Sequence, residues 1–257
     1  MRRVLAITAA MIMIMILSVT AEAVPTKIVV RAKAKDAKFI GTSMGGAFVV
    51  IKDVETGELL AKGSTVGSTG NTNRIMIDPV KRGTQLSDDA TAKFEMNIDI
   101  DEPRLVTVEV HAPYSQRQSM IKSSTQLWLI PGKHIAGDGI IIEVPGFVID
   151  VTAPQSPDGM KLSEGKVSVA VKATITTMCG CLITPAGMWD ANRYDVAATV
   201  KLDGKVIGNV PLKYAGKPSY FEGTLDLTKT GLYELDVYAY DPVSGNTGLD
   251  RTTFTVY

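Results

Sequence analysis

Alternation of apolar and polar residues with a period of two runs through most of this chain of 257 residues and constrains its fold more than any other feature. Successive side chains of a β-strand point to opposite faces, so this period predicts strands with one buried and one wet face. Residues 233–240 are the clearest case, since tyrosine, leucine, valine and alanine at odd positions alternate with acidic residues and tyrosines. Helical periodicity is almost absent. The chain is therefore predicted to be all-β.

The predicted strands fall into two groups. The first group comprises residues 27–35, 47–53, 59–64, 92–100, 105–112, 126–130 and 140–151, and the second comprises residues 166–178, 194–202, 205–207, 220–227, 232–241 and 249–256. Two prolines and a glycine in residues 153–159 interrupt the alternation and predict a linker. Short strands separated by turns are typical of antiparallel sandwiches. We expect two antiparallel β-sandwich domains, residues 24–153 and 154–257.

The N-terminal residues 1–23 have the features of a secretory signal peptide. Arg2 and Arg3 precede an apolar run over residues 6–19, and Ala21-Glu22-Ala23 matches an A-x-A cleavage site. The apolar run is shorter than the roughly 20 residues of a membrane span. We therefore expect export to the periplasm or the cell exterior, with no membrane span after cleavage. An uncleaved N-terminal anchor is the alternative.

Charge and motif content argue against several classes of function. The 27 basic and 27 acidic residues balance, so the chain lacks the basic surplus of a nucleic-acid-binding protein. No P-loop or dinucleotide fingerprint is present. Residues 41–45 match G-x-S-x-G, but a strand rather than a helix is predicted to follow, contrary to a nucleophile elbow. The two histidines, His111 and His134, have no catalytic partner in the pattern. We expect a non-enzymatic protein.

Two segments resemble known families. Residues 231–241, followed by 244–248, resemble the last hairpin of bacterial immunoglobulin-like domains, which reads G-x-Y-x-hydrophobic-x-V-x-A-x-D and then G-N-x-G. Residues 49–63 resemble the opening hairpin of carboxypeptidase-regulatory-like, or transthyretin-like, sandwiches, with the pattern D-x-x-T-G-x-x-L-x-x-G. These resemblances imply a transthyretin-like sandwich over residues 24–153 and an immunoglobulin-like sandwich over residues 154–257, both within an immunoglobulin-like fold class. They imply scaffold or binding modules of exported proteins, and they supply no catalytic residue.

The only two cysteines form the motif Cys179-Gly180-Cys181. Residues i and i+2 of a regular strand are about 6.8 Å apart, whereas the Cα atoms of a disulfide are roughly 5.5–6 Å apart. Closing the pair therefore needs a bend, which Gly180 permits. A disulfide here would enclose almost no chain and so contribute little stability. The motif is better explained by chemistry than by stabilisation.

Three interpretations of the cysteine pair remain open. In the first, Cys179 and Cys181 are thiolate ligands of a soft metal, with Met178 and Met188 as thioether ligands, and the sulfur-only set favours Cu(I). In the second, the pair carries out thiol–disulfide exchange, which needs an exposed thiol of lowered pKa, and Arg193 is the nearest basic residue that follows the pair. In the third, the pair is buried or incidentally oxidised and has no role.

The loop over residues 183–192 is the expected binding loop of the second domain, because end loops of such sandwiches carry binding sites. Trp189 is its candidate anchor for a protein partner. We therefore expect an exported binding or accessory protein with an extracytoplasmic protein partner and copper as its candidate metal. The rival functions are a thiol–disulfide redox protein acting on exported partners and a structural adaptor that docks a larger extracytoplasmic complex.

Overall fold

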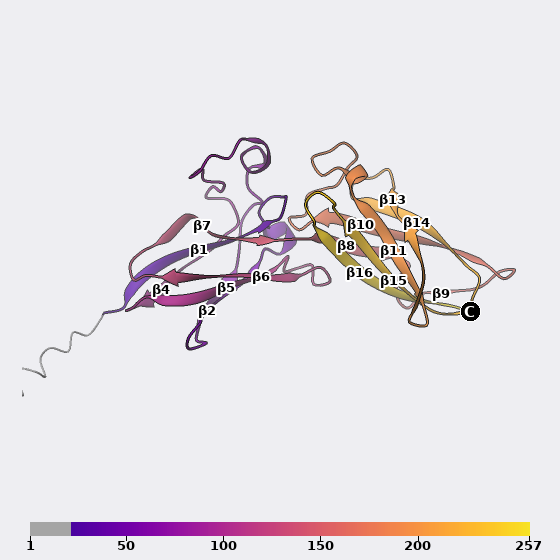
Figure 1. Ribbon diagram of the computed structural model, residues 1–257, viewed down its shortest axis with the longest axis horizontal. Helices are drawn as coiled ribbons and strands as arrows, with labels where there is room; N and C mark the ends of the chain where they lie inside the picture. Colours follow the sequence, from indigo (N-terminus) through magenta and orange to yellow (C-terminus); the bar gives the residue numbers. More distant parts are fainter. Residues whose placement is uncertain (1–21) are drawn as a thin grey trace, which may run out of the picture.

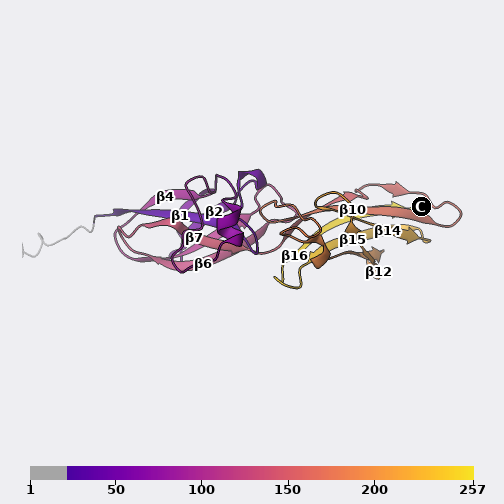
Figure 2. The ribbon, with the colours of Figure 1, turned by 90° about the horizontal axis from the view of Figure 1, so that it is seen from above.

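A computed structural model describes residues 22–257, and the predicted signal peptide lies almost entirely outside the described residues. Two β-sandwiches lie end to end and form an elongated molecule (Figures 1 and 2). The all-β prediction is confirmed, since helical structure in the described part is limited to the short turns η1 (Thr42–Met44), η2 (Asn73–Ile77) and η3 (Ala191–Arg193). Among residues 22–257, no helix has the length and apolar character needed to cross a membrane.

Seven strands build the N-terminal sandwich. They are β1 (Val24–Ala34), β2 (Phe48–Asp53), β3 (Leu59–Ser64), β4 (Phe94–Ile100), β5 (Arg104–Ala112), β6 (Ile121–Leu129) and β7 (Ile135–Val144). One sheet has the order β4-β1-β7 and the other has the order β3-β2-β5-β6. The edge strand β6 of one sheet contacts the edge strand β7 of the other, and β3 likewise contacts β4. The two sheets therefore pack face to face with their edges aligned.

The inner faces of these sheets follow the alternation of the sequence. Val106, Val108 and Val110 of β5 are fully buried, while the residues between them are partly exposed. Strand β1 differs because it is buried on both faces. Arg31 on its outer face is 2% exposed and donates hydrogen bonds to the carbonyl groups of Thr91 and Ala92. The long segment between β3 and β4 therefore covers β1.

The N-terminal sandwich is not wholly antiparallel, which corrects the prediction. Strand β7 pairs in parallel with β1, with Val30 opposite Ile140 and Ala34 opposite Val144. The chain enters this sandwich at the end remote from the C-terminal sandwich and must leave at the end next to it (Figure 1). The first and last strands consequently run in the same direction.

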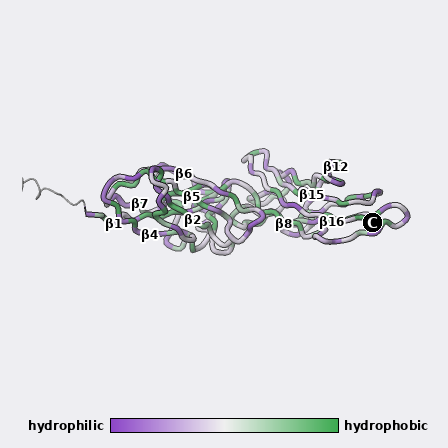
Figure 3. Tube along the Cα trace, turned by 90° about the horizontal axis from the view of Figure 1, so that it is seen from below, coloured by the Kyte–Doolittle hydropathy of each residue, from purple (hydrophilic) through white to green (hydrophobic). Residues whose placement is uncertain are grey.

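Nine strands build the C-terminal sandwich. They are β8 (Phe147–Ala153), β9 (Gly159–Met160), β10 (Val167–Thr177), β11 (Asp195–Leu202), β12 (Lys205–Pro211), β13 (Lys213–Tyr214), β14 (Tyr220–Leu227), β15 (Gly231–Tyr240) and β16 (Thr247–Val256). The sheets have the orders β13-β14-β10-β8 and β12-β11-β15-β16-β9, and only the β16–β9 pair is parallel. Apolar segments recur along the strands of both sandwiches (Figure 3).

The chain passes from one sandwich to the other at Pro145-Gly146. The strand predicted over residues 140–151 is divided there, because β7 pairs with β1 whereas β8 pairs with β10. Proline removes a ladder donor, and Gly146 has a φ of 123°. The expected boundary at residue 153 thus lies at the far end of β8, and residues 153–159 form a loop within the C-terminal sandwich rather than a linker.

Direct hydrogen bonds join the two sandwiches. The Ser119 hydroxyl accepts from the amide of Ile149 at 3.1 Å and lies 3.3 Å from the Ile149 carbonyl oxygen. The Asn246 side chain donates to the Lys35 carbonyl at 3.1 Å and accepts from the Gly146 amide at 2.9 Å. Buried apolar residues form one continuous core that extends through both sandwiches. The two sandwiches therefore pack as a unit.

Tyr233 is the largest fully buried side chain of the C-terminal core and provides a test of the packing. It stacks on Phe254 with ring centroids 5.4 Å apart, and its hydroxyl donates to the Lys229 carbonyl at 2.9 Å. Tyr233→Ala should lower the free energy of unfolding by about 3–5 kcal/mol, the usual cost of removing a large core aromatic. Leu232→Ala, at a 50% exposed neighbouring position, should change it by about 0.5 kcal/mol at most. Urea denaturation of both variants checks this, and similar losses in the two would contradict the packing.

Candidate functional site

The Cys-Gly-Cys motif forms a tight turn directly after β10. The Gly180 amide donates to the Thr177 carbonyl at 2.8 Å, and the Thr177 amide donates to the Cys181 carbonyl at 3.3 Å. Gly180 has a φ of 77°, a left-handed conformation that glycine adopts without steric cost. Residues 179–181 therefore do not have the extended backbone of a strand. The turn brings the two cysteine Sγ atoms to 2.6 Å from each other.

Cys179 lies in an environment that stabilises a thiolate. Its Sγ is 2% exposed and lies 2.6 Å from the Cys181 Sγ and 3.1 Å from the Thr177 hydroxyl. Hydrogen bonds from the Cys181 thiol, the Thr177 hydroxyl and the Lys38 backbone amide lower the pKa of Cys179 to about 6, against the opposing effect of burial. The hydrogen bond to Cys179, together with burial, raises the pKa of Cys181. Above about pH 6 these shifts favour a single proton on the pair, held by the more exposed Cys181.

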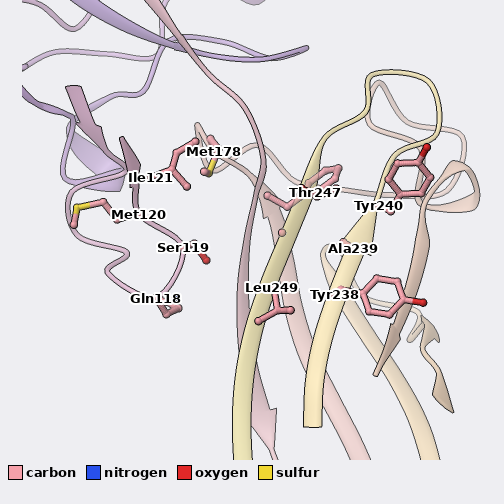
Figure 4. Close-up of a pocket in the computed structure, with 12 residues that line it drawn as sticks. Gln118, Ser119, Met120, Ile121, Met178, Tyr238, Ala239, Tyr240, Thr247 and Leu249 are labelled. Carbon is pink, nitrogen blue, oxygen red and sulfur yellow. The ribbon is translucent and has the colours of Figure 1, made fainter. Parts of the chain in front are cut away.

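The two methionines predicted as sulfur ligands differ in their surroundings. Met178 is 1% exposed and points into a cleft between the sandwiches, toward Gly146 (Figure 4). Met188 is 44% exposed on the following loop. Within residues 22–257, no group of three or more His, Cys, Asp or Glu side chains is arranged to hold a metal ion.

Met44 is the sulfur-bearing side chain that the sequence analysis missed. A β-carbon added to Gly180 would lie only 2.6 Å from the Met44 Sδ, so the thioether packs directly on the turn. Met44 belongs to η1 of the N-terminal sandwich, within residues 41–45 that were considered only as a nucleophile elbow. A separation of more than 130 positions leaves no sequence signal for this contact. Glycine is needed at position 180 for space as well as for backbone conformation.

Trp189 is an internal anchor, which corrects its prediction as a partner-binding residue. Its side chain is 9% exposed, and its Nε1 donates to the Asp36 carbonyl of the N-terminal sandwich at 2.9 Å. Arg193 reinforces the same contact through its Nη2, which lies 3.1 Å from the Asp36 carboxylate and 2.7 Å from the buried carboxylate of Asp241. The residues of the 183–192 loop thus dock the two sandwiches together.

A cleft of about 490 Å³ lies beside the cysteine turn, between the two sandwiches. One wall is the segment 118–121, which leads into β6, and the other consists of residues 238–240 and 247–249 at the end of the β15–β16 hairpin (Figure 4). Phe147 and Met178 complete the lining. Because Met178 directly precedes Cys179, the cleft and the cysteine turn share a short piece of chain.

Comparisons with known proteins give little information about this chain. No known protein family and no curated protein matches it. A crystal structure of an engineered protein is similar over 50% of this chain, at 16% identity and a TM-score of 0.29, and the match spans about a quarter (24%) of that protein. The C-terminal domain of the Streptococcus pyogenes antigen I/II-family protein AspA is similar over 91% of this chain and 99% of that domain, at 10% identity and a TM-score of 0.23. Similarities this low carry no argument about function, and the two family resemblances noted in the sequence stay predictions.

The role of Trp189 as an internal anchor can be tested with the other tryptophan of the chain as control. Trp189→Phe keeps most of the buried ring but removes the hydrogen bond to Asp36, so the free energy of unfolding should fall by about 1 kcal/mol. Trp128 is 56% exposed, and Trp128→Phe should have almost no effect. Urea denaturation followed by circular dichroism gives both values. Equal effects would show that Trp189 makes no stabilising contact.

Proposed function

We propose that this protein is an exported accessory protein whose Cys179–Cys181 pair undergoes thiol–disulfide exchange with disulfide-bearing exported partners. The observation that carries the proposal is the approach of the two Sγ atoms to 2.6 Å. A disulfide bond is about 2.05 Å long, so a small movement of the turn closes it. The export expected from residues 1–23 would place the pair in an oxidising compartment, where disulfides form and persist.

The exchange starts at Cys181, which is the more exposed of the two thiols. The lowered pKa that exchange requires belongs to its buried neighbour Cys179, so Cys181 must first lose its proton to become the nucleophilic thiolate. Its proton passes to the Cys179 thiolate 2.6 Å away, and its sulfur attacks one sulfur of the partner's disulfide. A mixed disulfide forms, and the other sulfur of the partner leaves as a thiolate. The Cys179 sulfur then attacks the Cys181 sulfur, forms the internal disulfide and expels the partner's second sulfur. Two electrons pass to the partner, and the single proton of the pair ends on the partner's dithiol.

Binding of a soft metal is the second candidate, and the sulfur environment favours it. A stabilised thiolate at Cys179 and the Met44 thioether over Gly180 are donors that suit Cu(I). The spacing of the cysteines fits this candidate less well. Two sulfurs bound at about 2.3 Å to a tetrahedral ion lie roughly 3.7 Å apart, so the thiols would have to separate before both could bind one ion.

Thiolate formation should follow the lowered pKa of Cys179. The thiolate absorbance in the ultraviolet should rise with a midpoint near pH 6, for one thiolate per chain, rather than near the ordinary thiol value of 9.0. Thr177→Val removes one donor and should raise the midpoint, whereas Thr176→Val on the opposite face should leave it in place. A midpoint near 9 in the unmodified protein would contradict the proposed thiolate environment.

The same shift predicts the pH dependence of stability. A thiol whose pKa is lower in the folded protein stabilises the fold when ionised, so its contribution is complete above pH 9 and decreases as the pH falls toward 6. The difference in unfolding free energy between the unmodified protein and Cys179→Ala should therefore narrow between pH 9 and pH 6. Urea denaturation at several pH values measures this difference, and a constant value would rule out ionisation of Cys179 in the folded state.

Oxidised glutathione provides a direct test of exchange. The reduced protein should lose two hydrogens in intact mass and retain no glutathione, because Cys179 resolves the mixed disulfide. Cys179→Ser should instead accumulate a glutathione adduct on Cys181, while Cys181→Ser should react much more slowly because Cys179 is buried. Stoichiometric Cu(I) binding without exchange, lost in Cys179→Ser and weakened in Met44→Leu, would replace the proposal with metal binding.

A further inference from the structure

The cleft between the sandwiches has no charged wall. Of the residues that line it, none is Asp, Glu, Lys, Arg or His, and apolar or aromatic side chains dominate. From this geometry we infer that the cleft is a binding site for an uncharged, largely apolar small molecule. This site is separate from the thiol chemistry of the cysteine pair.

Three of the polar side chains at the cleft already form hydrogen bonds within the protein. Ser119 and Gln118 hydrogen-bond to the backbone of Ile149, with the Gln118 Nε2 at 3.2 Å from its carbonyl. The Tyr238 hydroxyl accepts from the Asn209 side chain at 3.2 Å. The groups left to contact a ligand are therefore mostly aromatic rings, thioethers and aliphatic chains, together with the uncharged hydroxyl groups of Tyr240 and Thr247. A charged ligand would lose its hydration there without gaining a counterion.

The cleft is formed without a ligand. The two hydrogen bonds between Ser119 and Ile149 fix one wall to β8. The other wall is fixed because a β-carbon at Gly248 would lie 2.8 Å from the Phe147 carbonyl oxygen, so the β16 backbone packs directly on the first residue of β8. A preformed site loses little conformational freedom on binding. Its volume of about 490 Å³ lies within the range of about 300–1,000 Å³ that is usual for small-molecule sites, which often lie between domains.

The lining also indicates the shape of the ligand. Tyr238 and Tyr240 of β15 belong to the lining, and Figure 4 shows their rings on the side of β15 away from residues 118–121. Aromatic rings pack well against flat apolar groups. Met120 and Met178 have flexible, polarisable side chains that adapt to different ligand outlines. An uncharged molecule with an aromatic or other flat apolar body fits this combination.

The uncharged fluorescent probe N-phenylnaphthylamine tests the inference on the mature protein. We expect saturable one-to-one binding with increased fluorescence. Leu249 is 46% exposed at the cleft, so Leu249→Glu places a charge there without disturbing the core and should weaken binding roughly ten-fold or more. Leu249→Ala should weaken it less. Leu232→Glu, at the opposite end of the same hairpin, is the matched control and should bind as the unmodified protein does.

Three results would overturn the inference. The first is no saturable fluorescence change, and the second is binding that Leu249→Glu leaves intact. The third is concentration-dependent dimerisation that Leu249→Glu abolishes, which would make a second copy of the chain the occupant of the cleft. The double variant Cys179→Ser, Cys181→Ser should still bind the probe, so failure of this inference and failure of the proposed thiol exchange are separate results.

Discussion

The relative position of the two sandwiches depends on the buried side-chain amide of Asn246. The amide is 4% exposed, donates to Lys35 of the N-terminal sandwich and accepts from Gly146, where the chain crosses between the sandwiches. A buried amide is costly when its hydrogen bonds are not made. This requirement holds the segment after β1 against the end of the β15–β16 hairpin. The G-N-x-G pattern in residues 245–248, which resembles a hairpin of bacterial immunoglobulin-like domains, therefore supplies a connection between sandwiches.

The contacts of the cysteine turn depend on the relative position of the two sandwiches. The segment held by Asn246 continues through Asp36, which binds Trp189 and Arg193, to Lys38, whose amide donates to Cys179. One short loop of the N-terminal sandwich thus orients the 183–192 loop and stabilises the thiolate.

The interface also has an apolar part, and the cleft belongs to it. Ser119 and Phe147 hold its walls, while Met178 extends from the cysteine turn to its floor. Met178 lines the proposed ligand site, and Cys179 belongs to the proposed redox site. The two proposed sites are therefore adjacent in the chain.

The alternation of the sequence by itself determined the all-β class and most strands, because side-chain period is a local property of the chain. Residues 59–64 and 220–227, for instance, match β3 and β14 in both bounds. The cysteine pair was also identifiable as a candidate site, since its residue types and spacing are local. The parallel pairing of β1 with β7, the crossing at Pro145-Gly146, the burial of Trp189 and the contact of Met44 with Gly180 were decided only by the tertiary structure. Each of these depends on segments far apart in the chain, and no periodicity of a single segment encodes which distant segment covers it.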